Sequence, residues 1–366
     1  NFYMNFEKIF KNKKIIVTGH TGFKGSWLTL WLTKLGANVL GISKDIPTKP
    51  SHFDSLNLKK KIKHKQININ NYNEIAKIFK EFQPSFVFHL AAQSLVSKSY
   101  EEPIETFNTN SIGTLNVLES LKQIKKKCFV IFVTSDKVYK NVEKVKGYKE
   151  EDVLGGKDPY SGSKAAAENI INSFIHSYYN KPSSKILISI ARAGNVIGGG
   201  DWSPNRIVPD CVKSWSKNKF VVIRNPNSTR PWQHVLEAVG GYLILAAKLS
   251  LNKKFHSHAF NFGPSNTNNY KVIELIKKLG FFWKQGFKIR IKKNDKSFYE
   301  SKLLKLNSNK IKKFTNWRSI LTFEETTNLV ALWYKNYYQQ NDSIEKISLN
   351  QIKFYEDNLK RRIKNL

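Results

Sequence analysis

Ser135, Tyr160 and Lys164 have the side chains and the spacing needed to take a proton from an alcohol. Tyr160 and Lys164 are four residues apart, so on a helix they lie side by side, one turn apart. A phenol titrates near ~10 in water, and a neighbouring ammonium lowers its pKa toward the range of a useful base. Ser135 follows an apolar run, residues 128–133, which predicts a buried strand, and its hydroxyl can bond the same substrate oxygen. The three residues predict proton removal while hydride leaves the same carbon.

A glycine-rich turn near the N-terminus predicts a dinucleotide site. A short β-branched strand, residues 13–18, leads into Gly19, Gly22 and Gly25, and an amphipathic helix follows over residues 26–35. Glycines let the backbone approach a pyrophosphate, and the helix N-terminus offers free N–H groups and positive potential. Because a strand precedes the turn and a helix follows it, the motif is stronger evidence for dinucleotide binding than the glycines alone.

The end of the second predicted strand does not identify the dinucleotide. In NAD-specific enzymes this strand, here residues 38–42, ends in an acid that binds the adenine ribose. This chain has Ser43, Lys44 and then Asp45 at that point. The acid comes late and a lysine is adjacent, so the motif leaves NAD and NADP open.

Further strands and helices alternate regularly as far as residue 191. Strands are expected over residues 85–90 and 185–191, with a long helix over residues 105–126 between them. Alternation of this kind predicts an α/β fold with a Rossmann-type, doubly wound parallel sheet and ligands at the carboxyl ends of its strands. His89, at one such end, is expected to be structural.

Beyond Arg192 the alternation breaks, which indicates a second, smaller α/β domain for substrate. We expect residues 11–192 to form the NAD-binding domain, with residues 235–263 returning to it. The substrate domain would then comprise residues 193–234 and 264–340, including a strand over residues 287–291. A peripheral helical tail, residues 341–366, follows. Arg206 and Arg230 are placed to bind phosphate, because guanidinium pairs with phosphate oxygens in a bidentate manner.

The composition limits the binding partners and the cellular compartment that we expect. The chain has 366 residues and a formal net charge of +33, but its lysines are scattered and no arginine-rich arm occurs. We therefore expect no nucleic-acid partner. No window approaches the ~18 continuous apolar residues of a membrane span, so no membrane partner is expected. Cys128 and Cys211 lie far apart, which favours neither a disulfide framework nor a metal site and fits a cytoplasmic protein.

Several motifs together resemble a known family. They are Gly19-x-x-Gly22-x-x-Gly25, His89-Leu-Ala-Ala-Gln93, Thr134-Ser135-Asp136-Lys137, Tyr160-x-x-x-Lys164, the run from Arg192 to Trp202 and Arg230-Pro-Trp-Gln-His234. This set resembles the extended short-chain dehydrogenase/reductases and, within them, the nucleotide-sugar 4,6-dehydratases, especially those acting on CDP-glucose. The motifs span nearly the whole chain. The resemblance implies a bound NAD, a CDP-sugar substrate, and a homodimer built on helices near residues 105–126 and 160–179, with pairing of dimers into tetramers left open.

The resemblance also implies the site residues. The expected catalytic residues are Ser135, Asp136, Lys137, Tyr160 and Lys164. The expected cofactor-binding residues are Gly19, Thr21, Gly22, Phe23, Gly25, Asn68, Ile69, Leu90, Ala91, Ala92, Tyr160 and Lys164. The expected substrate-binding residues are Ser94, Asn195, Arg206 and Arg230, and no metal is expected. Asn68 and Asn307 depart from the family, which often has aspartate at both places.

The implied reaction has three stages: oxidation at C4 of CDP-D-glucose, loss of water across C5 and C6, and return of hydride to C6. The elimination needs a base for the C5 proton and an acid for the C6 hydroxyl. Related dTDP-sugar dehydratases carry an Asp-Glu pair where this chain has Asp136 and Lys137. Asp136 could be the acid, and Lys137 the base or a stabiliser of the enolate. The assignment stays open, as do a purely structural Lys137 and a related reaction, 4-epimerisation or dehydration of a GDP-, dTDP- or UDP-sugar.

Overall fold

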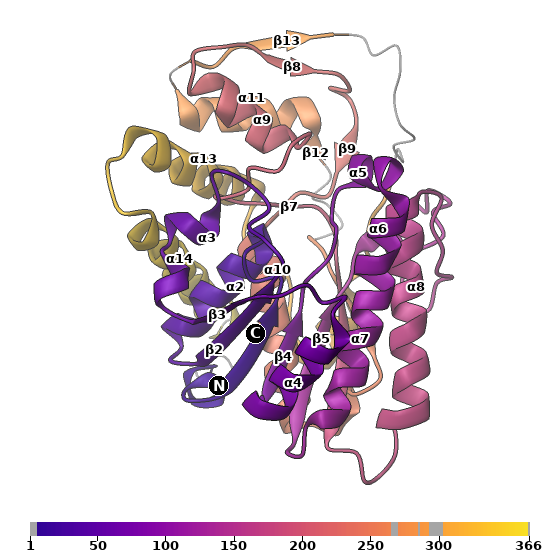
Figure 1. Cartoon of the computed structure of the whole chain (residues 1–366). Coiled ribbons are helices and arrows are strands. Elements are labelled where there is room, and N and C mark those ends of the chain that lie inside the picture. The colour runs from indigo at the N-terminus through magenta and orange to yellow at the C-terminus, as the bar shows by residue number, and fades with distance from the viewer. Residues whose placement is uncertain (1–5, 265–269, 285, 293–302, 365–366) are drawn as a thin grey trace.

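Seven parallel strands form one sheet at the centre of the molecule (Figure 1). The computed structural model describes residues 6–264, 270–284, 286–292 and 303–364. The strand order is β11-β6-β5-β4-β1-β2-β3. The strands are β1 (Lys14–Thr18), β2 (Asn38–Ser43), β3 (Lys63–Gln66), β4 (Phe86–His89), β5 (Cys128–Val133), β6 (Ile186–Ala193) and β11 (Ala259–Phe262). The order reverses between β1 and β4, so the predicted doubly wound sheet is confirmed.

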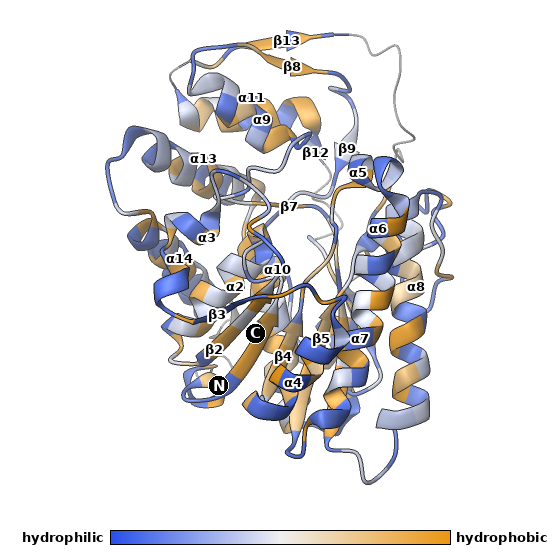
Figure 2. Cartoon of the chain, in the orientation of Figure 1, coloured by the Kyte–Doolittle hydropathy of each residue, from blue (hydrophilic) through white to orange (hydrophobic). Residues whose placement is uncertain are grey.

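The central strands are apolar on both faces because helices cover both. Ile15 and Val17 of β1 point into one core, and Ile16 between them points into the other. All three side chains are fully buried. This is the period-2 geometry of a strand buried on two sides, and it explains why the strands are continuous apolar runs. In Figure 2 the strands are mostly hydrophobic, and the surrounding helices carry hydrophilic residues as well.

Helices from distant parts of the chain form the two covering layers. On the face of Ile16 lie α4 (Tyr72–Phe82), α7 (Gly113–Ser120) and α8 (Pro159–Phe174), and on the other lie α2 (Phe23–Lys34) and α10 (Val235–Leu251). The remaining α-helices are α1 (Phe6–Phe10), α3 (His52–Ser55), α5 (Val96–Glu101), α6 (Pro103–Phe107), α9 (Ile207–Trp215), α11 (Val272–Trp283), α12 (Asn309–Thr315), α13 (Phe323–Gln339) and α14 (Ile344–Lys364). The second core therefore joins segments from residue 16 to residue 190.

The long helix expected over residues 105–126 is confirmed as an unbroken helical run, but its expected end at residue 126 is wrong. The run consists of α6, a π-helical segment (Asn108–Ile112), α7 and a short 3-10 turn (Leu121–Gln123). Within the π segment, the Asn110 side chain accepts a hydrogen bond from the Gln93 backbone N–H at 2.8 Å and donates one to the Ser163 hydroxyl at 2.9 Å. A side chain tied on both sides widens the helix locally, and the loop after β4 is thereby held against α8.

A smaller group of elements lies beyond the carboxyl edge of the sheet. Its strands are β7 (Val196–Ile197), β8 (Val221–Ile223), β9 (Thr229–Arg230), β10 (Gln233–His234), β12 (Tyr270–Lys271) and β13 (Ile289–Ile291). They pair as β7 with β10, β8 with β13 and β9 with β12. Figure 1 shows β8, β13, α9 and α11 together above the sheet. The strand expected over residues 287–291 begins two residues later than predicted.

The expectation of a peripheral C-terminal tail is also wrong. The tail is helical, but Ile352, Tyr355 and Leu359 of α14 belong to the main core. The Tyr355 hydroxyl donates to a carboxylate oxygen of buried Glu237 on α10 at 3.0 Å. The tail is rich in lysine and asparagine, which suggests a solvated segment. Its apolar residues nevertheless recur every three or four positions and form one buried stripe.

Candidate active site

One cavity of about 850 Å³ opens at the carboxyl edge of the sheet, below the smaller group of elements. Its lining contains every residue that the sequence marked for cofactor, substrate or chemistry. These residues come from the turn after β1, the loops after β3, β4 and β5, the first turns of α8, and the segments that follow β6. Carboxyl ends of parallel strands meet at one edge, which is why residues 19 to 230 converge there.

The turn between β1 and α2 requires its glycines. Gly19 has φ +75°, and a Cβ there would lie 2.7 Å from the backbone nitrogen of Ala91. A Cβ on Gly25 would overlap the backbone of Gly19. Gly22 is the N-cap of α2 and provides no side-chain cap, so the N–H groups of the first turn face the cavity without a side-chain acceptor. This is the donor set that a pyrophosphate needs.

Ser43, which stands where an acid was expected, is used to hold the turn. Its hydroxyl accepts from the Thr21 backbone N–H at 3.4 Å and hydrogen-bonds His20 Nδ1 at 3.0 Å. The Thr21 hydroxyl donates to the backbone oxygen of Asp45 at 2.7 Å. Ser43, Lys44 and Asp45 all line the cavity. The strand end therefore braces the glycine turn through Ser43, while Asp45 is displaced two residues along the loop.

Asn68 and Ile69, which follow β3, and the small residues that follow β4 also line the cavity. Ile69 is buried, and the Asn68 side chain accepts from the Asn70 backbone N–H at 3.0 Å. Leu90, Ala91 and Ala92 line the same cavity. His89 is buried between Thr18 Oγ1 at 2.8 Å and Thr114 Oγ1 at 3.1 Å, which agrees with its expected structural role.

Ser135 stands one residue beyond the end of β5, with extended backbone angles of φ −147° and ψ 160°. Its hydroxyl donates to a carboxylate oxygen of Asp136 at 3.0 Å and accepts from the Lys137 backbone N–H at 3.2 Å. Ser135 and Asp136 are buried and Lys137 is partly buried. The short 3-10 turn Asp136–Val138 thus presents three polar side chains in sequence at the strand end.

The first two turns of α8 carry Tyr160 and Lys164. Asp158 is the N-cap: its carboxylate accepts from the Ser161 backbone N–H at 2.9 Å, and Pro159 occupies the first helical position. Both features begin a helix at this point. The Ser135 hydroxyl also hydrogen-bonds the Tyr160 phenol. Tyr160 and Lys164 are both buried, so serine, phenol and amine share one wall.

The expectation that Lys164 lowers the pKa of Tyr160 is wrong for the protein without ligands. Burial, with help from the carboxylates of Asp136 and Asp158, raises the pKa of the Tyr160 phenol to about 12. Burial and the neighbouring Lys24 lower the pKa of Lys164 to about 8. Desolvation disfavours both charged forms and is the largest cause of both pKa shifts. The phenol is therefore protonated at neutral pH before ligands bind.

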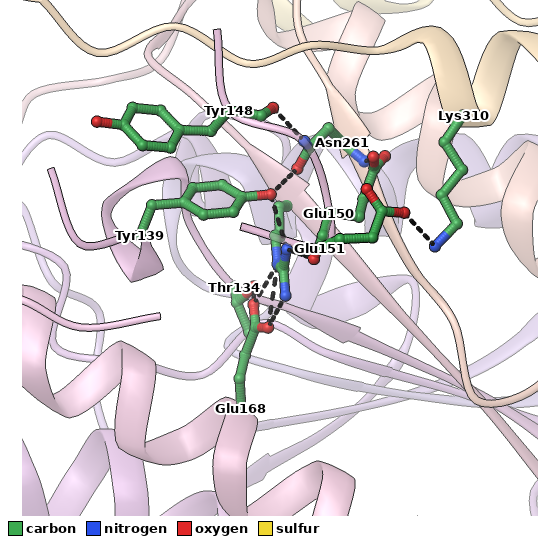
Figure 3. A network of polar contacts seen from close by, with 9 residues as sticks. Thr134, Tyr139, Tyr148, Glu150, Glu151, Glu168, Asn261 and Lys310 are labelled. Atoms are coloured by element: carbon green, nitrogen blue, oxygen red, sulfur yellow. Dashed lines mark hydrogen bonds and ion pairs between the residues drawn. The ribbon is translucent and has the colours of Figure 1, made fainter. Parts of the chain in front are cut away.

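A buried ion pair joins the end of β5 to α8 and β6 (Figure 3). Arg192 Nε donates to Glu168 at 2.9 Å, and the Thr134 hydroxyl donates to the same carboxylate at 2.5 Å. Arg192 Nη1 donates to the Tyr139 hydroxyl at 2.7 Å, which in turn donates to Asn261 on β11. Thr134 directly precedes Ser135, and Glu168 lies one turn beyond Lys164. The network therefore fixes the position of Ser135, after β5, relative to Tyr160 and Lys164 on α8.

The cavity lining also contains the residues expected to bind substrate: Ser94, Asn195, Arg206 and Arg230. Arg206 forms an ion pair with Asp201 at 2.8 Å. Arg230 lies in β9 and donates to the backbone oxygen of Thr229 at 2.8 Å. Ser94 is exposed at the rim and Asn195 is partly buried. Two guanidinium groups thus line the wall formed by the segments after β6.

Sequence reasoning missed Lys24, Asp158 and Glu168. The Asp-Pro pair before Tyr160 was a readable helix-start signal. Glu168 carried no signal, because its partners Arg192 and Thr134 are distant in sequence. Lys24 lies inside the glycine turn, where the sequence motif specifies only the glycines.

No group of three or more histidine, cysteine, aspartate or glutamate residues is arranged to hold a metal ion in the described part of the chain. Among the same residues, no helix combines the length and the apolar character needed to cross a membrane.

Comparison with solved structures supports the fold. An epimerase from Methanothermobacter thermautotrophicus superposes with a TM-score of 0.80 at 21% identity, covering 93% of this chain and 98% of that one. A dTDP-glucose 4,6-dehydratase from Bacillus anthracis, solved in complex with NAD, gives a TM-score of 0.73 at 21% identity and covers 92% and 99%.

Comparison of sequences identifies the family. A family model described as GDP-mannose 4,6 dehydratase matches residues 16–330. The CDP-glucose 4,6-dehydratase of Salmonella typhimurium is 39% identical over 341 residues, which cover 92% of this chain and 95% of that protein. The resemblance that the motifs suggested is confirmed, and the chain belongs to the nucleotide-sugar dehydratase family that the GDP-mannose 4,6 dehydratase model describes.

Proposed function

We propose that this protein is an NAD-dependent dehydratase that converts CDP-D-glucose to CDP-4-keto-6-deoxy-D-glucose and water. One observation carries the proposal: an alcohol-oxidising set and a separate acid–base pair line the same cavity. Ser135, Tyr160 and Lys164 suffice for oxidation at a hydroxyl carbon. Asp136 and Lys137 add what an elimination requires, and oxidation alone gives no use for them. The 39% identity to a CDP-glucose 4,6-dehydratase favours the cytidine nucleotide.

The residues of the glycine turn fit a dinucleotide. Gly19 and Gly25 leave room that any Cβ would fill, and the first N–H groups of α2 lack a side-chain cap. The cofactor-binding residues named from the sequence, including Thr21 and Phe23, line that end of the cavity. When bound, oxidised NAD supplies a hydride acceptor that can later return the hydride, together with a positive charge near the reacting sugar.

At C4, Tyr160 receives the hydroxyl proton and Ser135 holds the same oxygen. The phenol starts protonated, because burial raises its pKa to about 12. A cationic ligand and the Lys164 ammonium both favour the phenolate, so we assign proton acceptance to the ligand-bound state. Ser135 and Tyr160 line the same cavity, and the Ser135 hydroxyl is close enough to the phenol to act on its pKa.

At C5 and C6, Asp136 and Lys137 perform the elimination. Asp136 is buried, and a Cβ on Gly194 would lie 3.2 Å from its carboxylate, so the glycine leaves the carboxylate uncovered. We assign the C6 proton donor to Asp136 and the C5 side to Lys137, as base or as stabiliser of the enolate.

The charge of the cavity suits two phosphate-bearing ligands. Among the described lining residues are nine lysines and arginines and four aspartates. Arg206 and Arg230 provide guanidinium groups on the substrate side, which bind phosphate oxygens in pairs. A cavity with this excess of cations favours a ligand that carries several negative charges.

The substrate assignment is tested with a panel of CDP-glucose, dTDP-glucose, UDP-glucose and GDP-mannose. The expected result is 4-keto product from CDP-glucose with a kcat/KM well above that for the other three. Preference for another nucleotide would overturn the cytidine assignment. Formation of the 4-epimer without a 4-keto-6-deoxy product would replace dehydration by the epimerase alternative.

We further propose a cytoplasmic homodimer with the two-domain division drawn from the sequence. Ile104, Phe107 and Ile112 are exposed on α6 and the π segment that follows it, and Tyr178 is exposed in the π-helical segment Ile175–Tyr179 that follows α8. Exposed apolar side chains along neighbouring helices favour burial against a second copy. Cys128 and Cys211 are buried and unpaired, which suits a reducing compartment.

A further inference from the structure

Lys24 is a cation in the cavity that no proposed step uses. It occupies the second position of α2, between Phe23 and Gly25 of the glycine turn, and is partly buried. Lysine is unfavourable in the first turn of a helix, because the dipole there is positive. Its amine forms no hydrogen bond or ion pair with any residue that the structure describes. The ammonium therefore lies next to the positive end of the α2 dipole without a hydrogen-bond or ion-pair partner in the described residues. An anion from outside the chain would stabilise it.

The surroundings of Lys24 are set by a tight contact between α2 and the loop of residues 198–201. A Cβ on Gly198 would lie 3.1 Å from the Phe23 ring. The Trp27 indole N–H donates to the backbone oxygen of Gly199 at 2.9 Å. This loop leads directly to Asp201 and Arg206. The first turn of α2 therefore lies next to the cavity wall that carries Asp201 and Arg206, as well as next to the glycine turn.

Most of the charged groups close to Lys24 lie on the side of the cavity that carries Arg206. Its amine interacts with Arg206, Asp136 and Asp201 and lies close enough to Lys164 to affect it. Asp201 is already paired with Arg206, and Asp136 accepts a hydrogen bond from Ser135. Lys24 therefore has no carboxylate of its own, and the nearby Lys164 interacts with Glu168.

We infer that Lys24 binds a phosphate of a bound diphosphate. Its amine would then link the glycine turn to the cavity wall that carries Arg206. NAD and a CDP-sugar both contain a diphosphate, and the geometry around Arg206 favours that of the sugar nucleotide. The inference rests on the proposed function for the identity of the ligand. Its test uses binding and does not depend on turnover.

The test compares Lys24→Met, Lys24→Arg and Lys157→Met, a control that removes an exposed lysine from the same cavity. Titration calorimetry measures the affinities for CDP, cytidine and NAD. Loss of one charge-assisted phosphate contact should weaken CDP binding by about 10- to 100-fold in Lys24→Met. Cytidine binding should be unchanged, Lys24→Arg should retain most of the CDP affinity, and Lys157→Met should resemble the parent. Lys24→Gln replaces Lys24→Met if the latter does not fold.

The outcomes separate the two diphosphates. A loss for CDP with NAD affinity unchanged identifies the sugar nucleotide, and a loss for NAD alone identifies the cofactor. Unchanged affinity for both, or equal losses in Lys24→Met and Lys157→Met, would overturn the inference. A wild-type protein that binds CDP but gives no 4-keto product would contradict the proposed function and leave this inference standing.

Discussion

Tyr160 is the residue on which the first chemical step depends. Its phenol is buried, bonded by Ser135 and protonated at neutral pH in the protein without ligands, because burial raises its pKa to about 12. Tyr160→Phe keeps the ring that packs against the cavity wall and removes only the hydroxyl. We expect turnover to fall by ~10²–10⁴-fold, the usual contribution of a positioned acid–base group. Steady-state kinetics measure the loss, and circular dichroism shows that the fold is kept. Turnover within a few-fold of the parent would refute the assignment.

Lys137 is the residue that distinguishes this cavity from that of a simple dehydrogenase. We predict that Lys137→Met loses at least ~10² in kcat, because the C5 proton or the enolate charge is then left without its partner. The informative readout is the bound cofactor: the variant should still transfer the C4 hydride to NAD, seen as NADH absorbance, while formation of 4-keto-6-deoxy product stops. Loss of both processes would show that Lys137 only shapes the loop after β5.

At the scale of elements, the ion pair between Arg192 and Glu168 joins β6 to α8, and Thr134 joins β5 to both. Glu168→Gln leaves the buried Arg192 charge uncompensated, so we expect the free energy of unfolding to fall by ~3–5 kcal/mol. Thr134→Val removes one hydrogen bond and keeps the pair, so a loss of ~1 kcal/mol is expected. Denaturant titration measures both.

The same pair of variants tests whether the network positions the chemistry. Because Thr134 precedes Ser135, Thr134→Val should lower kcat by up to ~10²-fold through misplacement of the hydroxyl, with little change in KM. A Thr134→Val protein with unchanged kcat would limit the network to a structural role. A threonine away from the cavity, Thr33→Val on α2, controls for the loss of a hydroxyl.

Much of this arrangement could be predicted from the sequence, and the exceptions have physical causes. Local signals located the glycine turn, the end of β5 and the start of α8, and parallel topology brings those places together. The π segment (Asn108–Ile112) could not be predicted, since it depends on contacts of Asn110 with Gln93 and Ser163, far away in sequence. The pKa of Tyr160 depends on burial in the folded cavity, which residue spacing does not reveal.

At the scale of the whole molecule, the exposed apolar side chains of α6 and of the segments that follow α6 and α8 predict self-association. Ile104 is 76% exposed, and Ile104→Lys places a charge in the proposed interface. We expect light scattering after gel filtration to give twice the chain mass for the parent and the chain mass for the variant. Phe281→Lys, which changes another exposed residue on α11, should remain dimeric. A monomeric parent would contradict the dimer.

The central claim is that one cavity removes a hydride from C4 of the sugar and delivers it to C6 of the same sugar. Ser135, Tyr160 and Lys164 serve the oxidation, Asp136 and Lys137 serve the elimination, and all five line that cavity. The direct measurement uses CDP-glucose deuterated at C4, turned over in ordinary water with catalytic NAD, and product analysis by NMR and mass spectrometry. The account predicts deuterium at C6 of the 4-keto-6-deoxy product and no accumulation of NADH. Deuterium released into free NADH, or still at C4, would contradict it.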